Sequence, residues 1–107
     1  MTAGPTREML DPVRFITNLS TGEMGYSIAR EARRKGFQVT LISGPTCLIP
    51  PRGVRLIPIV TVKDLRAALK KHFLHHDVLF MSAAVGDFLP VTRFSKKVPR
   101  KKTLKVL

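Results

Sequence analysis

The sequence contains very little cysteine and no long apolar run. Cys47 is the single cysteine, so the chain cannot form an internal disulfide, which fits a reducing compartment. No stretch of about 20 apolar residues is present, and no apolar segment follows a basic N-terminus, so neither a membrane span nor a signal peptide is indicated. We therefore expect a cytoplasmic protein. Hydrophobic residues make up 44% of the chain, which is enough for a folded core.

Acidic residues are also few. The chain has 7 Asp and Glu against 19 Lys and Arg, and its formal net charge is +12. Basic residues are concentrated between positions 93 and 105, and no carboxylate follows Asp87. Such a run can bind a phosphate-bearing small molecule, form a solvated tail or bind nucleic acid. We rank these in that order, because nucleic-acid modules usually interleave aromatic residues and Phe94 is the single aromatic in this run.

The hydrophobic pattern predicts an α/β fold. Apolar strands alternate with amphipathic helices, with strands expected at 37–43, 54–60 and 77–85 and helices at about 24–34 and 62–73. This alternation indicates a parallel sheet covered on both faces. We expect a Rossmann-like three-layer sandwich with a mainly parallel sheet, in which Pro58 places its strand at an edge.

Both ends of the sequence read as incomplete. The first residues form a turn-like segment with no strand to feed it, and the last residues begin an alternating pattern that stops. An open parallel sheet normally has more than three strands. We therefore expect residues 1–107 to be part of one domain, truncated at both ends, with a basic flap and tail at about 91–107.

A loop of small residues precedes the first predicted helix, at positions 18–25. Ser20 and Glu23 have the spacing of a capping box, in which each side chain bonds the other residue's main-chain N–H. Gly22 and Gly25 let a ligand approach the backbone closely. A helix that starts here would direct its N–H groups and positive dipole end at an anion. Taken alone, however, the loop favours a capped helix start with packing glycines.

A ligand site is expected at the carboxyl ends of the strands, as in other open parallel sheets. Three segments fall there, at positions 3–7, 43–45 and 82–87. In the last of them, alanines leave space beside Asp87, whose carboxylate could hold a ribose hydroxyl, a base amine or a metal. Arg14 suits a bidentate contact with a carboxylate or phosphate, and Asn18 offers both a donor and an acceptor. Lys97 could reach a triphosphate, although a solvated charge is the simpler reading of a lysine in this run.

Other common sites are not indicated. The glycine loop lacks G-x-G-x-x-G and the G-K-[ST] of a P-loop, which argues against a nicotinamide Rossmann enzyme and a P-loop kinase. His72, His75 and His76 fall at a helix end, where polar residues are ordinary, so we expect no metal site. Cys47 has no neighbouring motif for nucleophilic catalysis.

Five segments together resemble one family, the phosphopantothenate–cysteine ligase domain of the bifunctional coenzyme A biosynthesis flavoproteins. They are Thr-Ala-Gly-Pro-Thr-Arg-Glu, Asp-Pro-Val-Arg-Phe-Ile-Thr-Asn, Ser-Thr-Gly-Glu-Met-Gly, Val-Thr-Leu-Ile-Ser-Gly-Pro and Ala-Ala-Val-Gly-Asp, at positions 2–8, 11–18, 20–25, 39–45 and 83–87. Each is weak alone, but the five occur in the family's order and spacing and cover most of the chain.

The resemblance implies a ligase reaction. Family members activate the carboxylate of 4′-phosphopantothenate with a nucleoside triphosphate, release pyrophosphate, and then let the amine of cysteine attack the acyl-nucleotide. Bacterial members usually take CTP, although ATP is possible, and the chemistry uses Mg²⁺. Family members dimerise, so we expect a homodimer. We expect no flavin, because no flavin decarboxylase domain precedes this segment.

The resemblance also implies roles for particular residues. Asn18 would contact the phosphopantothenate and its activated carbonyl, with Arg14 nearby, and Gly22 and Gly25 would belong to the surrounding loop. Asn18 and Lys97 would be the catalytic residues. The nucleotide pocket would be lined by Met81, Ser82, Ala83, Asp87 and Lys97, the last of them on a flexible flap.

The sequence departs from the family at several positions. Glu23 stands where Lys is usual, Leu19 where a polar residue is commoner, Gly86 where Ala is usual, and Pro99 interrupts the flap pattern. The second half of the family domain is also absent. Two alternatives therefore remain: a fragment that binds nucleotide or phosphopantothenate without turnover, and a basic nucleic-acid-binding module.

Overall fold

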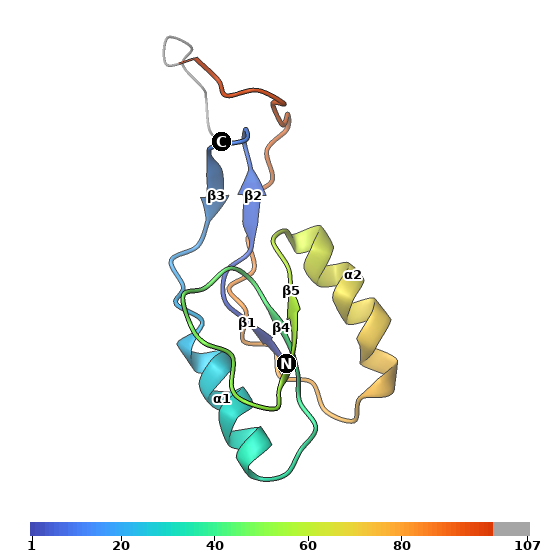
Figure 1. The fold of residues 1–107 in the computed structure, drawn as a ribbon. Helices are drawn as coiled ribbons and strands as arrows, with labels where there is room; N and C mark the ends of the chain where they lie inside the picture. Colours follow the sequence, from blue (N-terminus) through green and yellow to red (C-terminus); the bar gives the residue numbers. More distant parts are fainter. Residues whose placement is uncertain (100–107) are drawn as a thin grey trace.

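The computed structural model describes residues 1–99, and a parallel sheet lies at its centre (Figure 1). The strands β1 (Thr2–Ala3), β4 (Thr40–Ser43) and β5 (Arg55–Pro58) lie in the order β1-β4-β5. Both pairs are parallel, with Thr2 opposite Ile42 in the first. The predicted α/β fold is confirmed, and β5 lies at an edge of the sheet, as its proline predicts.

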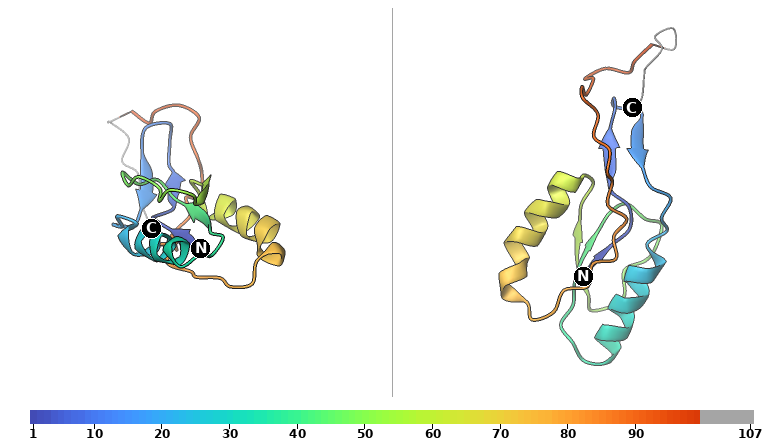
Figure 2. Two further views of the ribbon diagram at one scale, coloured as in Figure 1. Left: turned by 60° about the horizontal axis from the view of Figure 1, so that its bottom comes forward. Right: turned by 180° about the vertical axis from the view of Figure 1, so that it is seen from behind.

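Two helices cover opposite faces of the sheet, as Figures 1 and 2 show. They are α1 (Glu23–Arg34) and α2 (Val62–His72), and α2 leads into the short 3-10 helix η1 (Phe73–His75). Successive strand residues point to opposite faces, so Leu41 packs with α1 and Ile42 with α2. The two cores contain Ala3, Tyr26, Ala29, Val39 and Leu41 on one side and Ile42, Ile59 and Leu65 on the other. This is the predicted three-layer arrangement.

The two helices begin in different ways. α2 begins at a capping box, in which Thr61 Oγ1 accepts the N–H of Asp64 at 3.0 Å and the Asp64 carboxylate accepts the N–H of Thr61 at 3.0 Å. The N-cap of α1 is Gly22, with φ 83°, which has no side chain to accept an N–H of the helix. The capping box predicted for Ser20 and Glu23 is therefore wrong, because the left-handed backbone makes the glycine itself the cap residue.

The strand predicted at 77–85 forms only in part. Its residues run parallel to β1 on the side away from β4, with a bridge between Thr2 and Met81 and a hydrogen bond from the N–H of Thr2 to the oxygen of Phe80 at 3.0 Å. Four successive apolar side chains in it are 39–66% exposed: Val78, Leu79, Phe80 and Met81. The prediction that both faces of this strand are buried is wrong, because the helices within residues 1–99 leave these four side chains partly open to solvent.

The N-terminal segment also differs from the prediction. We expected a turn with no strand before it, but Thr2–Ala3 form β1, between β4 and the Met81 segment. A β-hairpin follows, in which β2 (Arg7–Met9) pairs antiparallel with β3 (Phe15–Thr17), and it projects beyond the sheet (Figure 1). No helix within residues 1–99 has the length and apolar character needed to cross a membrane.

Candidate functional site

The glycine loop and the turn after Met81 border a common cleft at the carboxyl end of β1. The cleft has a volume of about 540 Å³. Its lining residues come from the start of α1 and from the opposite turn: Leu19, Ser20, Thr21, Gly22, Glu23, Met24, Gly25 and Ser82. The glycine loop and the start of the segment at 82–87, both suggested by the sequence for ligand binding, therefore face the same space.

The two glycines of the loop allow α1 to approach β1 closely. A Cβ placed on Gly25 would lie 2.7 Å from Ser82 Oγ and would overlap the side chain of Ala3. A Cβ placed on Gly22 would lie 2.8 Å from Thr46 Cγ2, in addition to the cost of its positive φ. The packing role of the two glycines is therefore linked to their proposed role in ligand binding, because the close packing of α1 on β1 brings the start of the helix to the cleft.

The electrostatics of the cleft combine a helix N-terminus with one carboxylate. The first N–H groups of a helix lack intrahelical partners and carry partial positive charge. In α1 the N–H of Glu23 reaches Thr21 Oγ1 at 3.3 Å. The Glu23 side chain is exposed beside the same space, so its charge opposes the binding of an anion.

Two threonines hold the turn that borders the cleft, and although both lie in the segment at 2–8 that resembles the family, no role was predicted for either of them. Thr2 is fully buried, and its Oγ1 accepts the N–H groups of Ser82 at 3.2 Å and Ala83 at 3.3 Å. Ser82 Oγ donates in return to the main-chain oxygen of Thr2 at 3.2 Å. Further along, Thr6 Oγ1 accepts the N–H of Gly86 at 2.8 Å. A threonine in so short a strand has no distinctive sequence pattern.

Asn18 connects the two sides of the site. Its Nδ2 donates to the main-chain oxygen of Val85 at 3.2 Å, and the residue is exposed next to Leu19 at the edge of the cleft. Within residues 1–99 its carboxamide oxygen accepts no hydrogen bond, so it is available to a ligand. Asp87 lies just beyond Val85 and is also exposed.

The residues predicted for the nucleotide pocket are brought to the cleft only in part. Ser82 lines the cleft, and Met81 and Ala83 flank it along the same turn. Met81 is 56% exposed, and its sulfur accepts the hydroxyl of Thr2 at 3.7 Å. Asp87 and Lys97 do not line the cleft, and Lys97 lies on a different part of the molecule.

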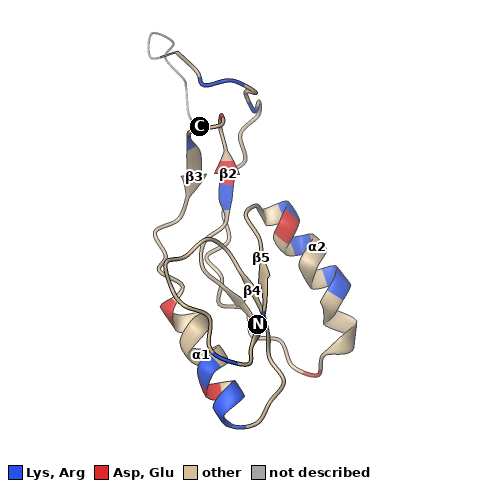
Figure 3. Cartoon of the chain, in the orientation of Figure 1, with Lys and Arg blue, Asp and Glu red and all other residues tan. Residues whose placement is uncertain are grey.

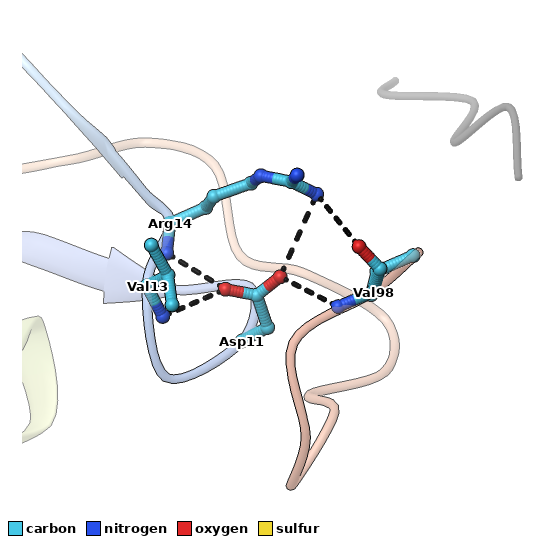
Figure 4. A network of polar contacts seen from close by, with 4 residues as sticks. All are labelled: Asp11, Val13, Arg14 and Val98. Atoms are coloured by element: carbon cyan, nitrogen blue, oxygen red, sulfur yellow. Dashed lines mark hydrogen bonds and ion pairs between the residues drawn. The ribbon is translucent and has the colours of Figure 1, made fainter. Parts of the chain in front are cut away.

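Arg14 lies at the turn of the β2–β3 hairpin, where it contacts Val98 (Figure 4). Arg14 Nη1 is 3.7 Å from the carboxylate of Asp11 and donates to the main-chain oxygen of Val98 at 3.4 Å. Lys97 directly precedes Val98 and is exposed. Neither cation lines the cleft, so the structure does not bring these two predicted site residues together with the glycine loop of the same chain.

The described basic residues are spread over several elements. Figure 3 shows Lys and Arg on α1, on α2 and on the segment near Lys97, with a few carboxylates between them. The described cations therefore come from several elements and not from one segment of the chain. The part of the predicted basic tail at 100–107 lies outside the described residues.

No histidine, cysteine or carboxylate cluster of metal-binding size occurs in the described part of the chain. His76 instead makes structural contacts, from Nδ1 to the main-chain oxygen of His72 at 2.7 Å and from Nε2 to Thr40 Oγ1 at 2.9 Å. Its ring therefore connects the end of α2 to the start of β4. Cys47 is exposed and is not in a disulfide.

Comparison with known proteins decides the family. The family model described as DNA/pantothenate metabolism flavoprotein C-terminal domain matches residues 1–107. The chain belongs to this family. The Coenzyme A biosynthesis bifunctional proteins CoaBC of Bacillus subtilis and Mycolicibacterium smegmatis are 46% and 48% identical to it over 101 residues, which is 94% of this chain.

Solved structures agree with this family assignment. The C-terminal domain of a Coenzyme A biosynthesis bifunctional protein CoaBC superposes with a TM-score of 0.82 at 43% identity, covering 92% of this chain and 52% of that one. The DNA/pantothenate metabolism flavoprotein from Streptococcus pneumoniae gives a TM-score of 0.80 at 36% identity, covering 84% of this chain and 40% of that one. The chain spans 25% and 24% of the length of the two curated relatives.

Proposed function

We propose that this chain is part of a ligase that joins 4′-phosphopantothenate to cysteine through an acyl-nucleotide, with CTP as the nucleotide, in coenzyme A biosynthesis. The observation that carries this proposal is the cleft shared by the glycine loop and the turn at Ser82, found in a member of the DNA/pantothenate metabolism flavoprotein family. The similarity of this chain to the Coenzyme A biosynthesis bifunctional proteins CoaBC supports it.

The proposed chemistry depends on positioning and on charge neutralisation. A carboxylate oxygen of 4′-phosphopantothenate attacks the α-phosphorus of CTP, and pyrophosphate leaves. The amine of cysteine then attacks the acyl carbon of the resulting acyl-cytidylate, forms the amide and releases CMP. We assign the acid to the start of α1 and the nucleotide to the turn at 82–87, so that the reacting atoms meet between them.

Each side of the cleft would supply groups suited to its ligand. Main-chain N–H groups at the start of α1 would hold the phosphorylated acid. Asn18 would orient the activated carbonyl, because it lies at the junction of the two turns and has an available carboxamide oxygen. The small side chains of Ser82 and Ala83 would let the nucleotide lie against the backbone.

The triphosphate also needs cations. Mg²⁺ commonly binds one or two carboxylates together with substrate phosphates and waters, so the exposed Asp87 fits an ion that arrives with the nucleotide. When bound, that ion would offset the charge of the triphosphate. Arg14 lies at the turn of the projecting hairpin, and Lys97 lies on the segment bonded to that turn, so in the proposed homodimer the hairpin of one copy would carry both to the cleft of the other.

A second candidate is a fragment that binds phosphopantothenate or nucleotide without turnover. Two observations favour it: the chain corresponds to 52% of the solved CoaBC domain, and the apolar side chains at 78–81 are uncovered. Residues that complete the pocket in the whole domain would then be supplied from elsewhere. A basic nucleic-acid-binding module is the third and weakest candidate.

Turnover and binding measurements separate these candidates. The chain is incubated with CTP, 4′-phosphopantothenate, cysteine and Mg²⁺, and CMP and pyrophosphate are quantified, with each substrate omitted in turn. Product that needs all three substrates supports the ligase, whereas nucleotide binding without product supports the fragment. Strongly salt-dependent binding of a DNA duplex with no nucleotide binding would contradict both.

A further inference from the structure

A buried carboxylate fastens a distant segment to the hairpin turn. Asp11 is fully buried (Figure 4), and its Oδ1 accepts the N–H groups of Val13 at 2.8 Å and Arg14 at 2.7 Å. Its Oδ2 accepts the N–H of Val98 at 3.1 Å, across 87 positions of sequence. One oxygen therefore holds the turn of the hairpin, and the other holds the segment that contains Lys97.

Further contacts limit the freedom of that segment. The N–H of Phe94 donates to the main-chain oxygen of Leu10 at 2.9 Å, and Val98 is 4% exposed. Arg14 Nη1 donates to the main-chain oxygen of Val98 at 3.4 Å. Lys97 thus lies between two anchored residues while its side chain is exposed. The backbone of Lys97 is fixed next to Arg14, and its ammonium group stays accessible.

We propose that Asp11 is a positioning residue, which sets Lys97 and Arg14 as one unit for holding the phosphates of the substrates. Asp11 has this role only if the proposed ligase function holds. The bond to Val98, together with the N–H groups and the cation at the hairpin turn, lowers the pKa of Asp11, which is consistent with a charged side chain in this position. Asp11 touches no substrate, and acts through the backbone of its neighbours.

The chemistry of the site suggests a selective substitution. Every partner of Asp11 is an N–H donor, so an asparagine can keep its oxygen on the side of Val13 and Arg14. Its NH₂ group then faces the N–H of Val98, where two donors meet. Asp11→Asn should therefore keep the hairpin turn and release the segment at 94–98. Val98→Pro removes the same bond from the other side, because proline has no N–H.

Hydrogen exchange and nucleotide binding test this together. Exchange of the amides at 94–98 and the Kd for CTP are measured for the full chain, for Asp11→Asn, for Val98→Pro, for Lys97→Ala and for Asp11→Asn combined with Lys97→Ala. Asp64→Asn is the control, because Asp64 also accepts main-chain N–H groups but caps α2. We expect exchange about tenfold faster and a Kd about tenfold higher in both anchor variants, with no further loss in the double variant.

The outcomes distinguish failure of the positioning role of Asp11 from failure of the ligase proposal. If the wild-type chain binds CTP and the anchor variants bind it equally well, the positioning role of Asp11 is wrong while the ligase proposal stands. If the losses of CTP affinity from Asp11→Asn and Lys97→Ala add up in the double variant, the proposal that the two residues act as one unit is likewise contradicted. If the wild-type chain binds no CTP, both the ligase proposal and the positioning role of Asp11 fail. Amide exchange at 94–98 that is the same in Asp11→Asn as in the wild type would show independently that Asp11 does not anchor this segment.

Discussion

The side-chain amide of Asn18 donates to the main-chain oxygen of Val85 at 3.2 Å, across 67 positions of sequence. This bond joins the loop before α1 to the turn that follows Met81. The two sides of the cleft are therefore held at a fixed separation by the residue that we assign to the activated carbonyl. Substitutions at this position test both its structural and its proposed chemical contribution.

Asn18→Ala should lower kcat for CMP formation about 100-fold, because the variant loses a polar group placed at the reacting carbonyl. The thermal midpoint should change little, since the residue is exposed. Gln38→Ala removes another exposed carboxamide, outside the cleft lining, and should leave kcat unchanged. Equal activity of the two variants would remove Asn18 from the proposed mechanism.

Glu23→Gln should tighten the binding of 4′-phosphopantothenate about two- to fivefold at low salt, because it removes a negative charge from the edge of the cleft. Glu31→Gln makes the same change of charge on α1, where Glu31 pairs with Arg34. Titration calorimetry of both variants should show the gain only for Glu23→Gln. The same gain in both would indicate a general effect of net charge.

Thr2→Val should lower the free energy of unfolding by about 1–3 kcal/mol, because the N–H of Ala83 then loses its hydrogen-bond partner in a partly buried position. Thr2→Ser retains the hydroxyl and should lose less. Urea denaturation measures both variants. A Thr2→Val protein as stable as the wild type would show that this bond does not hold the turn.

Gly25→Ala should destabilise the fold by about 1–3 kcal/mol through overpacking, which exceeds the gain of about 1 kcal/mol in helix propensity. The added methyl group would press against Ala3 and Ser82 and narrow the cleft. Ser27→Ala, on the exposed side of the same helix, should be neutral or stabilising. Stabilisation by both substitutions would mean that α1 can move away from β1.

The stability of the fold should fall in acid. The hydrogen bond from the N–H of Val98 is the main cause of the lowered pKa of Asp11. The hydrogen bond from the N–H of Thr61 is the main cause of the lowered pKa of Asp64. Because the pKa of each carboxyl is lowered in the folded state, its contribution to the free energy of unfolding is complete above the ordinary pKa of 3.8. That contribution is lost as the pH falls through the pKa of the folded state. Urea midpoints from about pH 6 to about pH 2 should therefore drop below about pH 4. The drop should be smaller in Asp11→Asn and Asp64→Asn, and a wild-type profile without it would contradict the bonding at both carboxylates.

The parts of the fold that were predictable depend on local patterns. The apolar run in β4 and the capping box at Thr61 and Asp64 are local, and both are present. The strand expected from position 37 begins only at Thr40, because the N–H of Phe37 bonds to Ala32 and completes the end of α1. The hairpin was missed because each of its strands has three residues, too few for alternation to be recognised.

The site was predictable only in part, for the same reason. Gly22 and Gly25 follow from the small-residue loop at a helix start, and Ser82 follows from the rule that ligands bind at the carboxyl ends of parallel strands. The structure places all three around one cleft. The positions of Arg14 and Lys97 depend on the projecting hairpin and on a contact between residues far apart in sequence. No local pattern contains that information.

Amide chemical-shift mapping of the ¹⁵N-labelled chain tests most directly whether the two turns form one substrate site. 4′-Phosphopantothenate is added first and then a CTP analogue that cannot release pyrophosphate. We predict that the acid shifts the amides of Gly22 and Gly25 most, and that the nucleotide shifts those of Ser82 and Ala83. Saturating ligands that leave all four amides unmoved, or that shift amides only outside both turns, would contradict a shared site.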